Sequence, residues 1–266
     1  MYEETERMSE PILLRCDADA VATLTLNRPA QRNALSRAMI AALSSVLDDI
    51  SQDPSIRAVV IAANGPGYCA GHDLKEVRAN PDRAFYDLLF AECSALMTRI
   101  VRLPQPVIAC VHGIATAAGC QLVASCDLAM ASEDARFATP GVNIGLFCST
   151  PMVALSRAVS RKHAMEMLLT GELMDAGTAW RFGLVNRVVP AADLRAETHA
   201  VAANIAGKSG ATVRIGKEAF YRQLEMRLDE AYDYASGVIA ANMEMRDAEE
   251  GINAFIDKRA PVWRHG

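Results

Sequence analysis

The chain has 266 residues, of which 51% are hydrophobic and 22% are charged, with a net charge of −5 at pH 7. This length can bury an extensive apolar core without disulfides or metals, and the composition is that of an ordinary soluble protein. The acidic balance argues against a nucleic-acid binder, which would carry a basic stripe. No apolar run reaches the roughly 18 residues that a membrane span requires.

The cysteines and the N-terminal residues indicate a compartment. There are seven cysteines, no CxxC pair occurs, and the spacing of Cys120 and Cys126 does not fit a zinc knuckle. We therefore expect buried, reduced thiols and no metal site. The opening stretch MYEETERMSE holds too many acids for a mitochondrial presequence and lacks the apolar centre of a signal peptide. These features predict a cytoplasmic protein.

Strand and helix patterns alternate up to Pro190. Residues 21–26 (VATLTL) alternate as a half-buried strand does, whereas 58–62 (AVVIA) and 107–111 (VIACV) are the continuous apolar runs of buried strands. Further strands are predicted at 127–131, 136–138 and 185–189. Helical spacing and capping residues predict helices at 36–53, 85–103, 118–125, 152–160, 162–169 and 175–183. Such alternation predicts an α/β fold with parallel sheets covered by helices.

Beyond Pro190 only helical patterns occur, at 191–206, 211–225, 228–245 and 247–259. Asp247 and Glu250 have the spacing of a capping box at the start of the last helix. The chain is therefore predicted to divide into a core of residues 1–190 and a helical region of residues 191–266. The helical region carries more apolar side chains than a small unit can bury, namely Phe220, Tyr221, Leu224, Tyr232, Ile239 and Met243. We expect a closed oligomer to cover them.

Two loop-to-helix segments are candidates for a binding site. Residues 68–75 (YCAGHDLK) follow a buried strand and a glycine-rich turn, and residues 112–121 (HGIATAAGCQ) join another buried strand to a helix. Small residues let the backbone approach a ligand, and a helix start presents free N–H groups that suit an anion or an oxyanion. Close packing alone explains small residues equally well. Neither segment reads GxGxxG, and the chain has no P-loop and no GxSxG motif.

These segments belong to a longer series of motifs. In chain order the motifs are Asn27-Arg28-Pro29, Asn33-Ala34-Leu35, 69–75, 106–113, 119–127, 136–138, 164–171, 183–185 and 247–259. On these motifs the chain resembles the crotonase (enoyl-CoA hydratase/isomerase) superfamily from about residue 11 to residue 265. The number of motifs and their order make the resemblance highly specific.

The resemblance implies a crotonase-type spiral of ββα units with a C-terminal helical oligomerisation region that builds a homotrimer or a hexamer. It implies an acyl-coenzyme A thioester as substrate and no permanently bound cofactor. The thioester carbonyl would lie in an oxyanion hole formed by the backbone N–H groups of His72 and Ala118, where most relatives have glycine at the second position. The coenzyme A side of the site would involve Arg28, Ala34, Ala70, Asp73, Leu74 and Lys75.

The resemblance breaks at the two positions where hydrating relatives carry glutamates, because these are Gln121 and Gly141 here. A positioned acid or base contributes about 10²- to 10⁴-fold in rate, and each oxyanion donor about 10²- to 10³-fold. Enolate stabilisation would therefore persist while hydration would be slow. Cys148 is a weak candidate for a replacement base, and the space beside Gly141 is a candidate place for an external anion that acts as base.

The leading hypothesis is an acyl-CoA enzyme, a hydratase-like lyase or isomerase that needs an enolate but little help from protein carboxylates. Decarboxylation, or isomerisation with a substrate or external base, meets this description. The alternative from another class is a non-catalytic acyl-CoA binding protein, and a purely structural trimer is the third hypothesis. Acyl-CoA binding separates the first two from the third, and turnover separates the first from the second.

Overall fold

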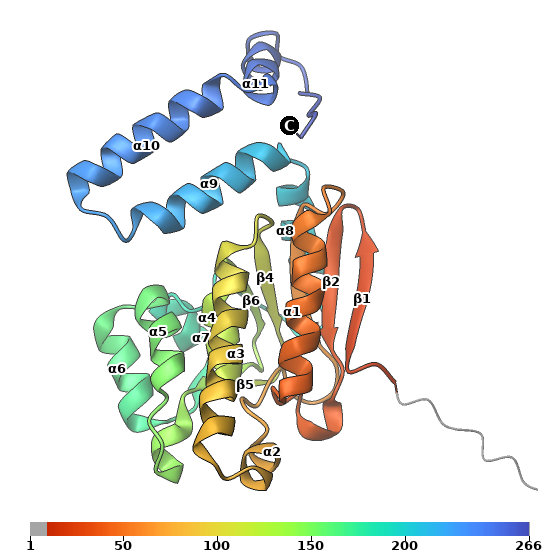
Figure 1. The fold of residues 1–266 in the computed structure, drawn as a ribbon. Helices are drawn as coiled ribbons and strands as arrows, with labels where there is room; N and C mark the ends of the chain where they lie inside the picture. The colour runs from red at the N-terminus through yellow and green to blue at the C-terminus, as the bar shows by residue number, and fades with distance from the viewer. Residues whose placement is uncertain (1–9, 266) are drawn as a thin grey trace, which may run out of the picture.

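The computed structural model describes residues 10–265, which form a six-stranded sheet, a three-stranded sheet, covering helices and a helical arm (Figure 1). The larger sheet contains β1 (Leu13–Ala18), β2 (Val21–Leu26), β3 (Ala58–Ala63), β4 (Val107–Val111), β6 (Leu128–Ser132) and β9 (Arg187–Val189), in that order across the sheet. The smaller sheet contains β5 (Ile114–Thr116), β7 (Arg136–Ala138) and β8 (Met174–Asp175). The stretch read as unlike a presequence lies almost wholly outside the described residues.

The helices follow the predicted pattern closely. They are α1 (Arg37–Gln52), α2 (Leu74–Ala79), α3 (Arg83–Arg102), α4 (Ala118–Ser125), α5 (Ser149–Ala158), α6 (Arg161–Thr170), α7 (Ala176–Phe182), α8 (Leu194–Ala206), α9 (Gly210–Gln223), α10 (Leu228–Met243) and α11 (Arg246–Ile256). Two short 3₁₀ helices lie at Pro29–Gln31 and Pro140–Ile144. Within residues 10–265, no helix is long and apolar enough to cross a membrane.

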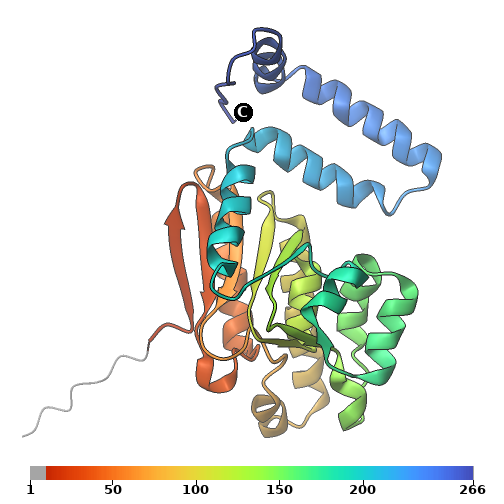
Figure 2. The same cartoon turned by 180° about the vertical axis from the view of Figure 1, so that it is seen from behind.

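The larger sheet is covered on both faces. Strand β1 pairs with β2 antiparallel, and every other pair in this sheet is parallel. Successive side chains of a strand point to opposite faces, so Val59 and Ile61 join the core beneath α1 and α3, whereas Ala58 and Val60 join the core beneath α8. Figure 2 shows α8 on the face opposite α1 and α3. Burial on both faces explains the continuous apolar run of β3, and the predicted α/β class is confirmed.

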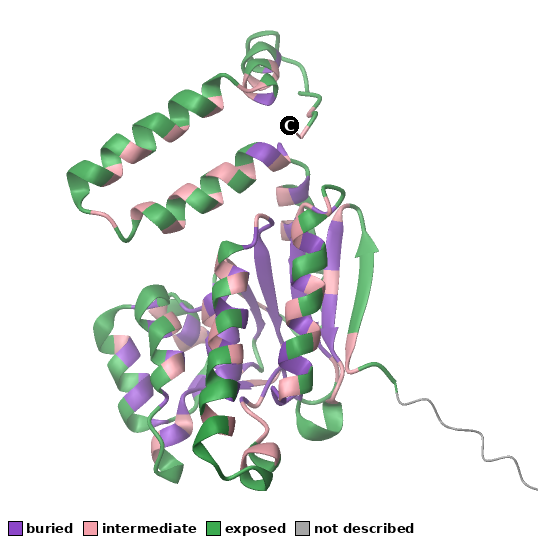
Figure 3. Ribbon diagram, viewed as in Figure 1, coloured by how far each residue is buried: buried purple, intermediate pink, exposed green. Residues whose placement is uncertain are grey.

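Helix α8 belongs to the core rather than to the helical arm. It packs against β2, β3, β4 and β6, and its Leu194, Ala202 and Ala206 lie in the same apolar cluster as Val60. The predicted boundary at residue 190 therefore precedes the last helix that covers the sheet. The arm itself consists of α9, α10 and α11, which extend away from the sheet and are mostly exposed (Figure 3).

A buried ion pair fastens the arm to the core. The ammonium of Lys217 on α9 lies 2.7 Å from a carboxylate oxygen of Asp127 and donates further hydrogen bonds to the carbonyls of Ile100 and Gln105. The Tyr221 hydroxyl donates to the other carboxylate oxygen at 2.9 Å. Tyr221 is therefore a partly buried anchor, which corrects its assignment to the uncovered apolar set. The other five members of that set are exposed: Phe220, Leu224, Tyr232, Ile239 and Met243.

The predicted capping box at the start of α11 is wrong. The helix begins one residue earlier, and the Asp247 carboxylate accepts hydrogen bonds from the amides of Arg264 and His265, at 2.7 and 2.9 Å. Glu250 forms an ion pair with Arg259 instead of reaching back to the helix start. Both carboxylates therefore hold the C-terminal residues against α11, because the chain folds back over the helix that they occupy.

Candidate functional site

The two glycine-rich and alanine-rich segments predicted to form a site meet in the structure. Cys69 pairs with Ala115 in a parallel bridge, and the Cys69 carbonyl accepts a hydrogen bond from the Thr116 amide at 2.9 Å. Two glycines at this junction have no room for a larger side chain. A methyl group at Gly119 would collide with the Cys69 carbonyl. One at Gly71 would lie 2.9 Å from the Ala117 side chain and 3.3 Å from the Ala118 amide nitrogen. The small residues therefore bring the backbone at residues 71–72 close to the start of α4.

The His72 amide is left free by the way its strand pairs. Residues Leu35 and His72 form an isolated parallel bridge, in which Leu35 donates to the Gly71 carbonyl at 2.7 Å and accepts from the Asp73 amide at 3.3 Å. In a parallel bridge the flanking groups make the hydrogen bonds, so the central N–H points away from the partner strand. Accordingly, the His72 N–H donates to no acceptor within residues 10–265.

The Ala118 amide is free because it begins a helix. Ala118 is the first residue of α4, where N–H groups have no intrahelical acceptor, and the preceding Ala117 offers no side-chain cap. Ala117 has the unusual backbone angles φ 50° and ψ −118° and is held by a hydrogen bond to the Ala138 carbonyl. No residue pattern signalled this strained backbone, which sequence reasoning missed. The Ala118 N–H lies at the positive end of the helix dipole, and the Ala118 nitrogen is close to Gly71, the residue before His72.

Three of the residues expected on the coenzyme A side are joined by hydrogen bonds. The Arg28 guanidinium lies 3.1 Å from the Asp73 carboxylate and donates to the Ala34 carbonyl at 3.0 Å. Burial tends to raise the pKa of Asp73, but the hydrogen bonds from Arg28 and from the α2 amides outweigh it and leave the pKa below its ordinary value. Asp73 also caps α2 through the Lys75 and Glu76 amides. These contacts give Arg28 and Asp73 a structural role, because they join the backbone at Ala34 to the start of α2.

The other three expected residues lie at the start of α2 and just before it. Leu74 and Lys75 are exposed, and the Lys75 ammonium has no acidic partner within residues 10–265. The Ala70 carbonyl accepts a hydrogen bond from the Thr116 hydroxyl at 3.2 Å. Leu74 and Lys75 are therefore the members of the predicted set that remain open to a ligand.

The two positions that lack the expected carboxylates, Gln121 and Gly141, have different surroundings in the structure. Gln121 lies on α4 with 3% of its surface exposed, and the buried oxygen of its side-chain amide has no hydrogen-bond partner within residues 10–265. Gly141 is also buried, in the 3₁₀ turn Pro140–Ile144. A methyl group there would lie 2.7 Å from the Leu146 carbonyl oxygen and 2.9 Å from the Cys148 sulfur. The chain therefore fills the place of a side chain at residue 141.

This packing corrects the expectation that the space beside Gly141 could hold an external anion. The Leu146 amide donates to the Gly141 carbonyl at 2.9 Å, so the loop folds back onto residue 141. The Leu146 carbonyl oxygen then occupies the space beside Gly141. A carbonyl oxygen repels an anion, and the thiol of Cys148 is only a weak donor. No pattern in the sequence predicts that the loop 142–147 folds back onto Gly141, because the contact is made by backbone atoms.

Burial shifts the pKa of the remaining ionisable groups near the site toward their neutral forms. Burial raises the pKa of the Cys148 thiol, and burial together with the neighbouring Cys148 raises the pKa of Cys120 to about 12. The His72 imidazole packs edge-on against Phe90, with ring centroids 5.3 Å apart. Burial lowers its pKa, and the nearby Leu35 carbonyl opposes this without a well-formed hydrogen bond. The thiols thus stay protonated and the imidazole neutral.

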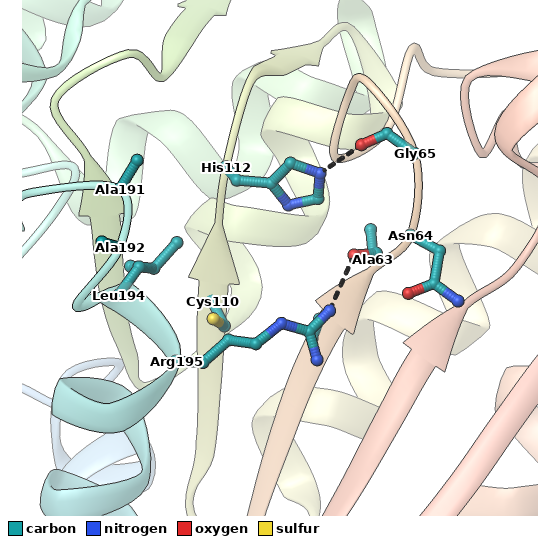
Figure 4. Close-up of a pocket in the computed structure, with 10 residues that line it drawn as sticks. Ala63, Asn64, Gly65, Cys110, His112, Ala191, Ala192, Leu194 and Arg195 are labelled. Atoms are coloured by element: carbon teal, nitrogen blue, oxygen red, sulfur yellow. Dashed lines mark hydrogen bonds between the residues drawn. The ribbon is translucent and has the colours of Figure 1, made fainter.

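A separate cavity of about 350 Å³ lies elsewhere, at the carboxyl ends of β3 and β4 beside the start of α8 (Figure 4). Arg195 donates to the Ala63 carbonyl there at 3.4 Å, and a His112 ring nitrogen lies 2.8 Å from the Gly65 carbonyl. None of the predicted site residues lines this cavity. The thiol at its floor, Cys110, has a pKa raised by burial, so the cavity presents no activated nucleophile.

Comparison with known proteins gives consistent matches along the chain. Residues 17–266 match the family model described as enoyl-CoA hydratase/isomerase. A curated Xenopus laevis protein named enoyl-CoA hydratase domain-containing protein 3, mitochondrial, is 48% identical over 96% of this chain and 87% of its own length. The crystal structure of an enoyl-CoA hydratase from Mycobacterium smegmatis has a TM-score of 0.94 at 56% identity, covering 96% of this chain and 99% of that one. The human enoyl-CoA hydratase domain-containing protein 3 has a TM-score of 0.93 at 47% identity, covering 95% and 100%.

These matches also correct the predicted cytoplasmic location. The Xenopus laevis protein and four other vertebrate relatives carry the word mitochondrial in their names, which points away from the cytoplasm. The prediction rested on the cysteines and on the composition of one short N-terminal stretch, and neither feature identifies an organelle. In sequence and in three-dimensional structure alike, the chain belongs to the enoyl-CoA hydratase/isomerase family.

Proposed function

We propose that the chain binds an acyl-CoA thioester and stabilises its enolate through the amide N–H groups of His72 and Ala118. The observation that carries this proposal is that the segment of His72 and the start of α4, each with an amide that has no acceptor among the described residues, are neighbours in the fold. Paired N–H donors suit the negative charge that develops on a thioester oxygen when a proton or carboxyl group leaves the adjacent carbon. The coenzyme A part would lie toward Leu74 and Lys75 and would be a substrate, with no permanently bound cofactor.

Hydration of a double bond would be slow at this site. It requires groups that take a proton from water and give one to carbon, and the two usual glutamate positions hold Gln121 and Gly141. An amide can orient a water molecule but cannot accept its proton. Reactions in which the substrate supplies its own charge or base, such as decarboxylation or isomerisation, place fewer demands on the protein.

Acyl-CoA binding without turnover is the second candidate function. It is favoured by the protonated thiols of Cys120 and Cys148, which are unsuited to act as bases near the enolate position. Both candidates require the same carbonyl contacts, so only a measured reaction distinguishes them.

The arm would serve assembly. Exposed apolar side chains on α9 and α10 include Phe220, Leu224, Tyr232, Ile239 and Met243, and an apolar surface of this kind is ordinarily covered by another subunit. We propose a homotrimer, alone or doubled into a hexamer, because closed symmetry covers the same face on every copy. Light scattering at micromolar concentration should report such an assembly, and a stable monomer would contradict it.

Calorimetric titration tests the binding proposal. Butanoyl-CoA should bind more tightly than free coenzyme A, since only the thioester engages the two amides. Ala118→Pro removes one N–H and should abolish this difference, whereas the matched variant Ala118→Gly keeps the N–H and should retain it. The proposal fails if the wild-type protein binds no acyl-CoA below millimolar concentration, or if a folded Ala118→Pro keeps the full preference for the thioester.

A further inference from the structure

A cavity of about 240 Å³ lies at the joint between the core and the arm. Its walls come from the end of α1, the residues just before β3 and β4, the first turns of α9 and the C-terminal His265. In Figure 1 the start of α9 and the C-terminus lie together near one end of the sheet, whereas α2 lies near the other end. The cavity is therefore remote from Leu74 and Lys75, and none of the residues proposed for acyl-CoA binding lines it.

Two guanidinium groups that line this cavity have no acidic partner. Arg57 belongs to the core and Arg214 to α9, and neither forms an ion pair within residues 10–265. Arg57 donates from its Nε to the Ala206 carbonyl, which leaves the N–H groups of its two terminal nitrogens available. Arg214 is exposed, so the cavity opens to solvent on its side. Both cations are therefore free to bind an anion that enters the cavity.

The imidazole of His265 and the dipole of α9 add donors and positive potential to the cavity. The Gly210 amide donates to Nδ1 of His265 at 3.1 Å, so this hydrogen bond places the ring proton on Nε2, a further donor. A methyl group at Gly210 would lie 3.5 Å from Cδ of Arg57 and 3.7 Å from Nδ1 of His265. Both side chains therefore meet at the start of α9, a helix of 14 residues whose N-terminal end carries partial positive charge.

One carboxylate, that of Asp53, also lines the cavity. It accepts hydrogen bonds from the amide and the hydroxyl of Ser55, at 2.9 and 2.6 Å, and lies 3.8 Å from the Arg15 guanidinium. Its charge is thus partly compensated by a cation outside the cavity, whereas the charges of Arg57 and Arg214 are not compensated. The cavity therefore keeps an excess of positive charge.

Unpaired guanidinium groups beside a helix start are the groups that proteins use to bind phosphate. We propose that this cavity binds a phosphate group, carried by inorganic phosphate or by a small phosphate monoester. Because Arg57 belongs to the core and Arg214 to the arm, the bound anion joins the two parts and stabilises the arm against the core. This site is separate from the proposed acyl-CoA site and does not depend on it.

Calorimetric titrations with inorganic phosphate and with glycerol 3-phosphate, at constant ionic strength, test the site. At least one of these anions should bind the wild-type protein with a Kd in the millimolar range or below, and the tighter of the two identifies free phosphate or a monoester as the source. Arg214→Met should weaken binding on the order of 10- to 100-fold, the range for hydrogen bonds to a charged group. The control Arg161→Met removes an exposed arginine on α6, outside the cavity, and should bind like the wild-type protein.

Hydrogen exchange followed by mass spectrometry tests the link to the arm. Saturating phosphate should slow exchange of the α9 amides in the wild-type protein and leave Arg214→Met unchanged. The inference is overturned if neither anion binds at tens of millimolar, if folded Arg214→Met binds as tightly as the wild-type protein, or if a bound anion leaves exchange in α9 unaltered. Failure of butanoyl-CoA to bind would instead refute the proposed function and leave this site standing.

Discussion

Replacing Gly141 with alanine should destabilise the protein, because the chain already occupies the place of a side chain there. The added carbon would lie 2.7 Å from the Leu146 carbonyl oxygen and 2.9 Å from the Cys148 sulfur. Both distances are well inside van der Waals contact, and the first involves backbone that a rotamer change cannot move. The loop 142–148 would have to shift, breaking the hydrogen bond from the Leu146 amide to the Gly141 carbonyl.

The magnitude follows from what overpacking costs in other protein cores. Inserting a methylene into a well-packed site costs about 1–3 kcal/mol. For a chain of this size each kcal/mol lowers the melting temperature by about 2–4 °C, so Gly141→Ala should melt roughly 2–12 °C below the wild-type protein. Gly141→Glu adds a carboxylate to the same crowded position and should melt lower still.

Thermal unfolding followed by circular dichroism, at one protein concentration, measures this effect. The matched control is Gly177→Ala in α7, where the added carbon would meet its nearest atom at an ordinary 3.5 Å. Alanine is the better helix former by about 1 kcal/mol, so the control should melt at or above the wild-type temperature. If Gly141→Ala melts with the control, the loop does not close on residue 141 and the reasoning is refuted.

Three further predictions concern the site and the arm. The wild-type protein should hydrate crotonyl-CoA at least about 10³-fold more slowly than a relative with both glutamates, and Gln121→Glu with Gly141→Glu should not restore the rate; a wild-type kcat near 10 s⁻¹ would contradict this. Burial lowers the pKa of the folded His72 imidazole, so lowering the pH through about 6.5, the ordinary pKa of an unfolded histidine, protonates the unfolded chain before the folded one. The wild-type protein should thus lose more melting temperature between pH 7.5 and 5.5 than His72→Phe, and equal losses would count against a buried imidazole. Lys217→Met leaves the Asp127 carboxylate without its ion-pair partner and should lower the free energy of unfolding in urea by about 3–5 kcal/mol. A loss below about 1 kcal/mol would show that the arm is held by other contacts.

Much of the fold could be predicted because its core strands and helices carry strong local signals. The apolar runs at 58–62 and 107–111 became β3 and β4, and the apolar spacing from residue 36 placed α1 to within a residue at each end. The edge strand β1 was not predicted. Its side chains are mostly exposed, so the sequence LLRCDA shows neither the alternation nor the apolar run that marks a strand.

The candidate site was predictable in position but not in detail. The resemblance proposed His72 and Ala118, which the structure places in neighbouring segments, yet the unusual backbone at Ala117 before the second amide has no sequence signature. The closure of Leu146 over Gly141 is likewise a contact between backbone atoms, which residue identity does not encode. The capping box at Asp247 failed for a related reason: a tertiary contact with the C-terminal residues took the carboxylate that local spacing had assigned to the helix start.

The central claim is that the His72 and Ala118 amides polarise the thioester carbonyl, and infrared difference spectroscopy tests it most directly. The ligand is butanoyl-CoA labelled with ¹³C at the thioester carbonyl, compared with its unlabelled form when bound and when free in water. Two N–H donors draw electron density to the carbonyl oxygen and weaken the double bond. The account predicts a carbonyl stretch at lower frequency in the complex than in water. A bound carbonyl that absorbs at or above its frequency in water would contradict the account.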